Sequence, residues 1–220
     1  MDLRPRNRSL ATALVCFAVL CAGHAGAEDP VDVAPAQPAA SEGAPAPIAR
    51  LNATLIEIMK GGAQLGYQGR YDMVEPVLVA TFDVPFMAAK SVGTTWRKLD
   101  AEQRERWVAA FEGYMVSNFA DRFDNFTGQS IEIVGEKPAS HDTRVVLTRI
   151  HRPGDDSVEL NYRMRETESG WRVVDIYSGG SVSEIALRRS EYAAVLKQGG
   201  IDKLIASVNA LSAQRADPRN

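Results

Sequence analysis

The sequence is poor in the side chains that most often carry thiol, redox or metal chemistry. It contains two cysteines, Cys16 and Cys21, and three histidines among 220 residues. Both cysteines fall in an N-terminal segment that we expect to be removed, which leaves no disulfide and no thiol nucleophile. Only His141 and His151 then remain as strong zinc ligands. We therefore expect no metal site and no cofactor.

The chain also lacks an apolar run long enough to span a bilayer comfortably. Its longest run, "LATALVCFAVLCA", follows Arg4, Arg6 and Arg8 and precedes the small residues 25–27. This order is typical of a secretory signal peptide, here residues 1–27. Export without disulfides is typical of a bacterial periplasm, so we expect a soluble periplasmic protein.

An excess of positive charge is missing as well. The formal net charge is −3, and it becomes −5 once Asp2, Arg4, Arg6 and Arg8 are removed with the signal peptide. Nucleic-acid-binding domains usually carry a dominant basic face. The sequence therefore argues against a nucleic-acid partner.

Residues 28–47 contain almost no large apolar side chain. This segment, "EDPVDVAPAQPAASEGAPAP", is rich in proline and alanine and cannot bury enough surface to offset the entropy of ordering. We interpret it as a disordered linker. Residues 48–213 are then one domain, and residues 214–220 a flexible tail.

The apolar residues of this domain change their spacing twice. Helical spacing runs through residues 48–58, 71–78 and, after the capping-box pattern of Asp100 and Gln103, a long helix to about Phe123. Alternation then predicts four strands, near residues 131–133, 145–147, 158–164 and 171–177. Helical spacing returns after residue 183. We predict an α+β fold, with N-terminal helices, a four-stranded antiparallel meander and two C-terminal helices on its apolar face.

The stretch "WRVVDIYSGGSVSEI" raises the question of catalysis. A nucleophile elbow needs Gly-x-Ser-x-Gly, but Ser181 is followed by Val182 and Ser183. A phosphate loop would need Gly-Lys-Ser/Thr after the paired glycines, which is also missing. We interpret the stretch as a turn from strand to helix, with Ser183 as the N-cap of the helix.

Four other titratable residues are candidates for acid-base chemistry, namely Asp83, Asp175, His141 and His151. Both histidines lie at turns or strand ends, where solvated side chains are expected. In a regular strand, Asp175 would lie on the same side as Trp171, Val173 and Tyr177, so its side chain could face inward. A structural role for Asp175, bonding nearby backbone or an arginine, is favoured over catalysis.

Four segments, in this order, resemble the MlaC family of phospholipid-binding proteins, also called toluene-tolerance auxiliary components. They are "FDVPFMAAKSVGTTWRKLDAEQRERWVAAFEGYMVSNFADRF", "TGQSIEI", "GWRVVDI" and "RRSEYAAVLKQGGIDKLI". The resemblance implies an α+β domain with a deep apolar cavity for acyl chains. It also implies a periplasmic carrier that touches membranes transiently. Its partners would be an inner-membrane ABC transporter complex and an outer-membrane lipoprotein complex.

The cargo implied by the resemblance is open between two lipids. The run "SVSEIALRRSEY" resembles the HpnM branch, which is associated with hopanoid biosynthesis, and the hinge before it carries what looks like one extra residue. A rigid hopanoid and a two-chain phospholipid need cavities of different shape. We therefore expect either a phospholipid or a hopanoid as ligand.

Apolar and aromatic side chains on the predicted helices and strands are candidates for the cavity wall. They are Phe82, Phe86, Met87, Phe111, Tyr114, Met115, Leu147, Leu160, Tyr162, Met164, Tyr177 and Leu187. Arg188 and Arg189 sit early in a helix, where positive charge opposes the helix dipole, so we expect them to meet a lipid head group or an acidic docking surface.

Two other functions remain open at this stage. A small-pocket enzyme of the isomerase or dehydratase kind would confine a cavity around Asp175 or another acid. A non-catalytic envelope interaction domain would have a filled core and no cavity. A lipid carrier that is not an enzyme is the favoured hypothesis.

Overall fold

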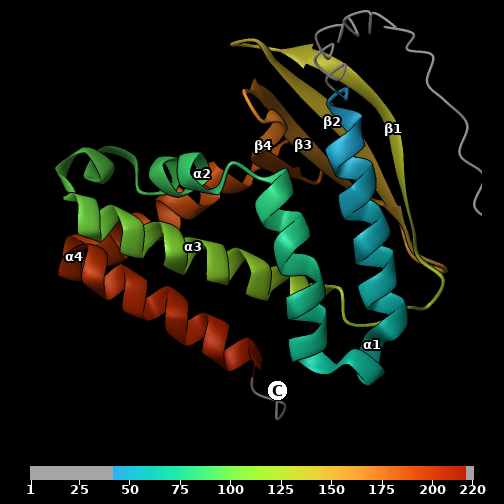
Figure 1. Cartoon of the computed structure of the whole chain (residues 1–220), viewed down its shortest axis with the longest axis horizontal. Coiled ribbons are helices and arrows are strands. Elements are labelled where there is room, and N and C mark those ends of the chain that lie inside the picture. The colour runs from blue at the N-terminus through green and yellow to red at the C-terminus, as the bar shows by residue number, and fades with distance from the viewer. Residues whose placement is uncertain (1–41, 217–220) are drawn as a thin grey trace, which may run out of the picture. The chain divides into compact units, whose positions relative to one another are not determined.

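A computed structural model describes residues 42–216, which form one compact unit (Figure 1). The predicted signal peptide, residues 28–41 of the predicted linker and the last four residues of the tail lie outside the described residues. No helix among residues 42–216 is long and apolar enough to cross a membrane.

The first half of the unit is helical, as predicted. It contains α1 (Pro45–Thr81), α2 (Val84–Ser91), the short 3-10 helix η1 (Gly93–Lys98) and α3 (Ala101–Arg122). Helix α1 begins three residues before Ile48, because proline is tolerated in a first helical turn. The capping box of α3 is confirmed, with Asp100 accepting from the Gln103 amide at 2.8 Å.

Helix α1 consists of two arms that meet at Gly62 and Gly66. Both glycines have positive φ, 34° and 61°, so the chain bends between the two predicted helical stretches, residues 48–58 and 71–78. A Cβ on Gly62 would lie 3.2 Å from the carbonyl oxygen of Asp124, which favours glycine at this close approach. Figure 1 shows the first arm lying along the sheet and the second turning back toward α3.

The second half begins with an antiparallel sheet of strand order β1-β2-β3-β4-β5. The strands are β1 (Ser130–Ala139), β2 (Thr143–His151), β3 (Val158–Thr167), β4 (Gly170–Ser178) and β5 (Val182–Ser183). The four-stranded meander is confirmed, and β5 adds a fifth strand. Because β5 has two residues, it carries no alternation that a sequence could display.

A bulge changes which side of β4 faces the helices. Met164 pairs with Val173, but Arg163 pairs with Asp175, so Val174 is an extra residue between them. Past this bulge the alternation shifts by one residue. Val173 therefore shares the helix-facing side of the sheet with Ile176, and not with Asp175.

Helix α4 (Glu184–Ala216) closes the fold in two arms joined by Gly199 and Gly200. The second arm lies beside α3 (Figure 1). Both arms bring an arginine to the same ring, since Arg188 and Arg215 lie 5.5 and 4.7 Å from the centroid of Tyr114. The two predicted C-terminal helices are thus present, and the helices cover one face of the sheet as expected for this α+β fold.

Candidate functional site

An apolar pocket of about 200 Å³ lies between the helix-facing side of the sheet and the helices α2, α3 and α4. Its wall consists of Met87, Phe111, Tyr114, Met115, Asn118, Phe119, Arg122, Phe123, Ile150, Val158, Leu160, Ile176, Ser178, Glu184, Ile185 and Arg188. Most of these side chains are apolar or aromatic, and they come from elements far apart in the sequence.

Helical periodicity explains how α3 supplies more than a third of this wall. Residues three and four apart share one face of a helix. Phe111 is followed at this spacing by Met115, Asn118 and Arg122, and all of them reach the pocket. The sheet contributes alternate residues, such as Val158 and Leu160, because side chains two apart point to the same side of a strand.

Two arginines give the pocket positive charge. The Arg188 side chain is 17% exposed and donates to Glu191 at 2.6 Å and to Glu184 at 3.4 Å. Burial works to lower the pKa of Arg188, but Tyr114 and Glu191 outweigh burial, and its pKa is raised. Arg122 is exposed, and no ion pair joins it to another residue in the range 42–216. The pocket therefore combines an apolar wall with one paired and one unpaired guanidinium.

Five of the twelve predicted cavity residues meet in this pocket: Met87, Phe111, Tyr114, Met115 and Leu160. Three others, Phe82, Tyr162 and Met164, lie on the helix-facing side but are fully packed. The Phe82 ring contacts Phe119 and Tyr162 edge-on, at centroid distances of 6.0 and 6.4 Å. These three residues form the filled core beneath the pocket, so the prediction did not separate core from wall.

Leu147 and Tyr177 lie on the opposite side of the sheet. Val146 pairs with Tyr162, so the alternation of β2 turns Leu147 away from the helices. Tyr177 pairs with Asn161 because the bulge at Val174 shifted the alternation of β4. The expectation that Tyr177 shares a face with Val173 is wrong for the same reason.

The remaining predicted residues are also outside the pocket. Phe86 lines a different, polar hollow, and Leu187 is 40% exposed on α4. Of the two predicted docking arginines, Arg188 reaches the pocket and Arg189 lines the same hollow as Phe86. Adjacent helical residues point in directions about 100° apart, which separates the two arginines.

Asp175 binds the start of α4. Its carboxylate accepts from the Ser183 hydroxyl at 2.6 Å and from the amides of Ile176 and Ile185 at 2.9 and 3.2 Å. Ser183 in turn accepts from the Ala186 amide at 3.0 Å, which confirms its predicted role as N-cap. The geometry thus supports the structural role favoured for Asp175.

Asp83 has a similar capping function. It caps α2 by accepting from the Phe86 amide at 3.1 Å, and it pairs with Arg165 at 2.6 Å. All of these bonds join elements of the fold, so the geometry supports a structural role for this carboxylate too.

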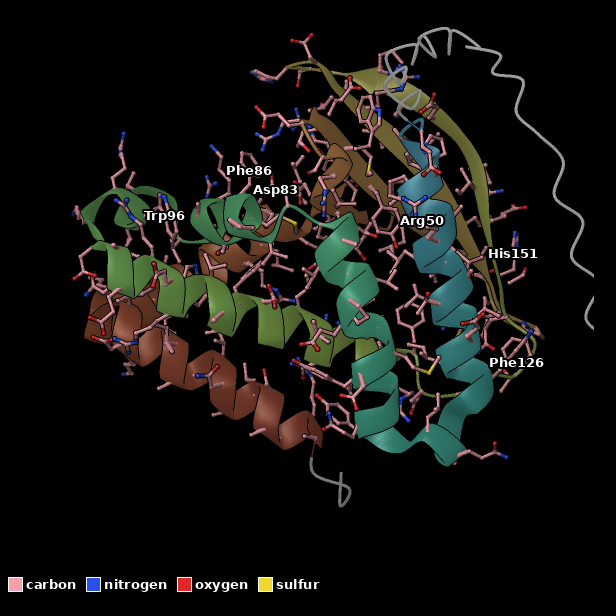
Figure 2. All side chains as sticks on the ribbon, viewed as in Figure 1. Arg50, Asp83, Phe86, Trp96, Phe126 and His151 are labelled. Atoms are coloured by element: carbon pink, nitrogen blue, oxygen red, sulfur yellow. The ribbon has the colours of Figure 1, made fainter. Side chains whose placement is uncertain are left out.

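His151 lies between two polar partners at the surface. Its Nδ1 is 2.9 Å from the Ser157 hydroxyl, and its Nε2 is 2.9 Å from Glu132. This order of groups resembles a serine–histidine–acid relay, but the imidazole is 43% exposed and lines none of the hollows described above. Figure 2 shows it far from Asp83 and Phe86. Residues 42–216 contain no cluster of His, Cys, Asp or Glu suited to a metal ion.

Sequence reasoning missed several wall residues. Asn118 and Arg122 continue the helical stripe of Phe111 and Met115, so the period of α3 would have found them. Ile176 depends on the bulge in β4 and Ile185 on the bend into α4. Neither feature has a signal in the spacing of apolar residues.

Comparisons with known proteins agree on one family. The family model described as MlaC protein matches residues 49–210. The intermembrane phospholipid transport system binding protein MlaC of Haemophilus influenzae is 25% identical over 141 residues, which are 62% of this chain and 65% of that relative. The chain thus spans just under two thirds of that relative's length.

A solved structure has the same fold. It is a phospholipid-binding protein from Ralstonia solanacearum in complex with a phospholipid, with a TM-score of 0.69 and 23% identity. The match covers 79% of this chain and 99% of that protein. At this identity the likeness supports the fold.

Proposed function

This chain belongs to the MlaC family, and on that premise we propose that it is a lipid carrier that holds the acyl chains of one phospholipid in its apolar pocket. The observation that carries the proposal is the apolar wall between the sheet and α3. Burying each methylene contributes roughly 0.8 kcal/mol, so free acyl chains strongly favour such a wall over water.

The apolar pocket is too small to hold two complete acyl chains in this conformation. About 200 Å³ is less than the roughly 300–1,000 Å³ of typical ligand pockets. Two complete acyl chains therefore require the helices to move away from the sheet. Helix α4 begins at a two-residue strand and bends at Gly199 and Gly200, so its first arm is the element that we expect to move.

We assign the head group to the arginine side of the pocket. Arg122 has no carboxylate partner among the described residues, so it offers a free guanidinium to a phosphate. Arg188 is neutralised by Glu184 and Glu191 and serves mainly to fix the wall. This assignment replaces the expectation that Arg188 and Arg189 act as a pair.

The cellular setting of the carrier is also a proposal. A periplasmic location follows from the predicted signal peptide, residues 1–27. We propose that the carrier exchanges phospholipid between an inner-membrane ABC transporter complex and an outer-membrane lipoprotein complex, and touches membranes only transiently. A hopanoid is the second candidate cargo, since the run at residues 181–192 resembles the HpnM branch.

Uptake of lipid from liposomes tests the proposal. Leu160→Trp adds volume inside the pocket, whereas Leu187→Trp makes the same change at an exposed position of α4. We expect the native chain and Leu187→Trp to extract labelled phospholipid, and Leu160→Trp to extract little. Equal extraction by both variants, or none by the native chain, would refute the pocket as the lipid site.

A further inference from the structure

A second hollow, which we call the basic groove, lies on the other side of Ile185 from the apolar pocket. It measures about 490 Å³ and lies between the outer side of the sheet, α2 and the first turns of α4. Ile185 lines both hollows. The two sites are therefore neighbours with different chemistry.

Four cations line the basic groove: Lys90 from α2, Arg163 and Arg165 from β3, and Arg189 from α4. Arg165 is paired with Asp83 at 2.6 Å. Within residues 42–216, the other three cations form no ion pair. This concentration of positive charge stands out in a chain whose formal net charge is −3.

The one acid in the groove wall does not offset this charge by direct pairing. Both oxygens of Asp175 are engaged, one by the Ser183 hydroxyl and the other by the backbone amides of Ile176 on β4 and Ile185 at the start of α4. Its negative charge is thus directed at the helix start. Among the described residues, no carboxylate accepts a hydrogen bond from Lys90, Arg163 or Arg189.

Contacts on α2 hold the cations close together. Arg165 and Lys90 both lie over the Phe86 ring, 4.4 and 5.1 Å from its centroid. Arg189 donates its Nε to the backbone oxygen of Lys90 at 3.0 Å, which fastens a second guanidinium to the end of α2. Like charges around one hollow repel each other, and a bound anion would offset that repulsion.

Arg163 approaches from the opposite wall. Its Nε donates to the Thr143 hydroxyl at 3.0 Å and its Nη2 to Ser140 at 2.9 Å. These bonds fix the guanidinium without neutralising it. Its Nη1 donates to no residue in the range 42–216, so Nη1 is available to a phosphate oxygen.

We infer that the basic groove is a binding site for a phosphate group, separate from the apolar pocket. Cations on three elements surround the hollow, and a phosphate presents more acceptor oxygens to such an arrangement than a carboxylate does. Two sources carry such a phosphate, the head group of an anionic membrane lipid and a soluble phosphorylated molecule. The site does not depend on which lipid occupies the apolar pocket.

The experiment compares two triple variants of the full secreted chain. Lys90→Gln/Arg163→Gln/Arg189→Gln removes the unpaired cations of the groove. Arg97→Gln/Lys98→Gln/Lys137→Gln removes three exposed charges that line none of the described hollows and changes net charge equally. Amide NMR shifts are followed during titration with sodium phosphate at constant ionic strength. A parallel binding assay uses vesicles of phosphatidylcholine with or without phosphatidylglycerol.

We expect binding of at least one probe to weaken by about tenfold or more in the groove variant and by less than about twofold in the control variant. Phosphate shifts at Lys90, Ala186 and Arg189 would identify a soluble ligand, and binding that needs phosphatidylglycerol would identify a membrane lipid. No binding of either probe, or equal loss in both variants, would overturn the inference. Bound lipid is measured by mass spectrometry in the same samples. Absence of lipid would count against the carrier proposal, whereas absence of phosphate or vesicle binding would count against the basic groove as a phosphate site.

Discussion

Individual polar residues fix the helix starts on which both hollows depend. Asp175 joins β4 to Ser183 and to the Ile185 amide, and Ser183 caps the next turn. Ile185 belongs to the wall of the apolar pocket and of the basic groove. The position of one carboxylate thus affects the shape of two sites.

Removing this carboxylate should destabilise the protein without changing any chemistry. Asp175→Ala leaves the Ser183 hydroxyl and the Ile185 amide without their acceptor, which costs about 1–3 kcal/mol of unfolding free energy. Ser181→Ala, at an exposed position of the same turn, should change it by less than about 0.5 kcal/mol. Urea unfolding measures both. Equal stability of the two variants would show that Asp175 does not hold the helix start.

The buried Tyr192 hydroxyl makes stability depend on alkaline pH. It has no hydrogen-bond partner among the described residues, and burial raises its pKa. A raised folded-state pKa means that the folded chain binds the proton more tightly. Stability is then complete below the unfolded value near pH 10 and falls above it.

Tyr192→Phe should therefore leave stability at pH 7 unchanged or raise it by up to about 1 kcal/mol, and make its decline above pH 10 shallower. The edge-on contact with Trp107, at a centroid distance of 5.5 Å, needs only the ring and is retained. Denaturant unfolding at pH 7, 9 and 10.5 checks this expectation. A steeper alkaline decline in the variant would contradict it.

At the scale of elements, the bend in α1 is fastened by one buried arginine. Arg70 donates to the backbone oxygens of Ala120 at 2.8 Å and Gly62 at 3.1 Å. The first bond joins α1 to the end of α3, and the second satisfies a carbonyl at the bend. The guanidinium thus holds the bend of α1 against the end of α3, the helix that carries Arg122.

Arg70→Met should cost about 1–3 kcal/mol of unfolding free energy, because two buried carbonyls lose their donor. Arg50→Met is the matched control on the same helix (Figure 2), where an exposed ion pair with Glu42 is worth at most about 1 kcal/mol. Chemical denaturation compares the two variants. A cost for Arg50→Met equal to that for Arg70→Met would contradict the assigned role.

The elements also show how far sequence reasoning reaches. The strict alternation of β3 predicted the buried face of Tyr162 and Met164, whereas the run "VVL" of β2 has apolar residues on both faces and misplaced Leu147. The bulge at Val174 depends on pairing with a neighbouring strand, so nothing in the period of β4 reveals it. The wall of the pocket and the filled core consist of the same kinds of apolar residues and differ only in how closely these pack. The sequence therefore could not show that Phe82 belongs to the core.

At the scale of the whole molecule, cargo in the apolar pocket should contribute to stability. A ligand that binds only the folded chain adds about 2.7 kcal/mol at a concentration one hundred times its Kd. For a domain of this size, that corresponds to roughly 5–10 °C in Tm. We expect chain stripped of lipid by organic extraction and refolded to melt below the untreated chain. The Tm should rise again when phosphatidylglycerol is added to the stripped chain. A Tm that changes neither on removal nor on addition of lipid would contradict stabilisation of the folded chain by its cargo.

Native mass spectrometry of the chain secreted to the periplasm and purified without detergent shows whether the folded chain carries a lipid. We expect a dominant species whose mass exceeds that of the chain by one phospholipid, and its loss in Leu160→Trp but not in Leu187→Trp. An excess mass equal to a hopanoid would retain the carrier and change its cargo. A folded chain that carries no lipid, and gains none after incubation with liposomes, would contradict its function as a lipid carrier.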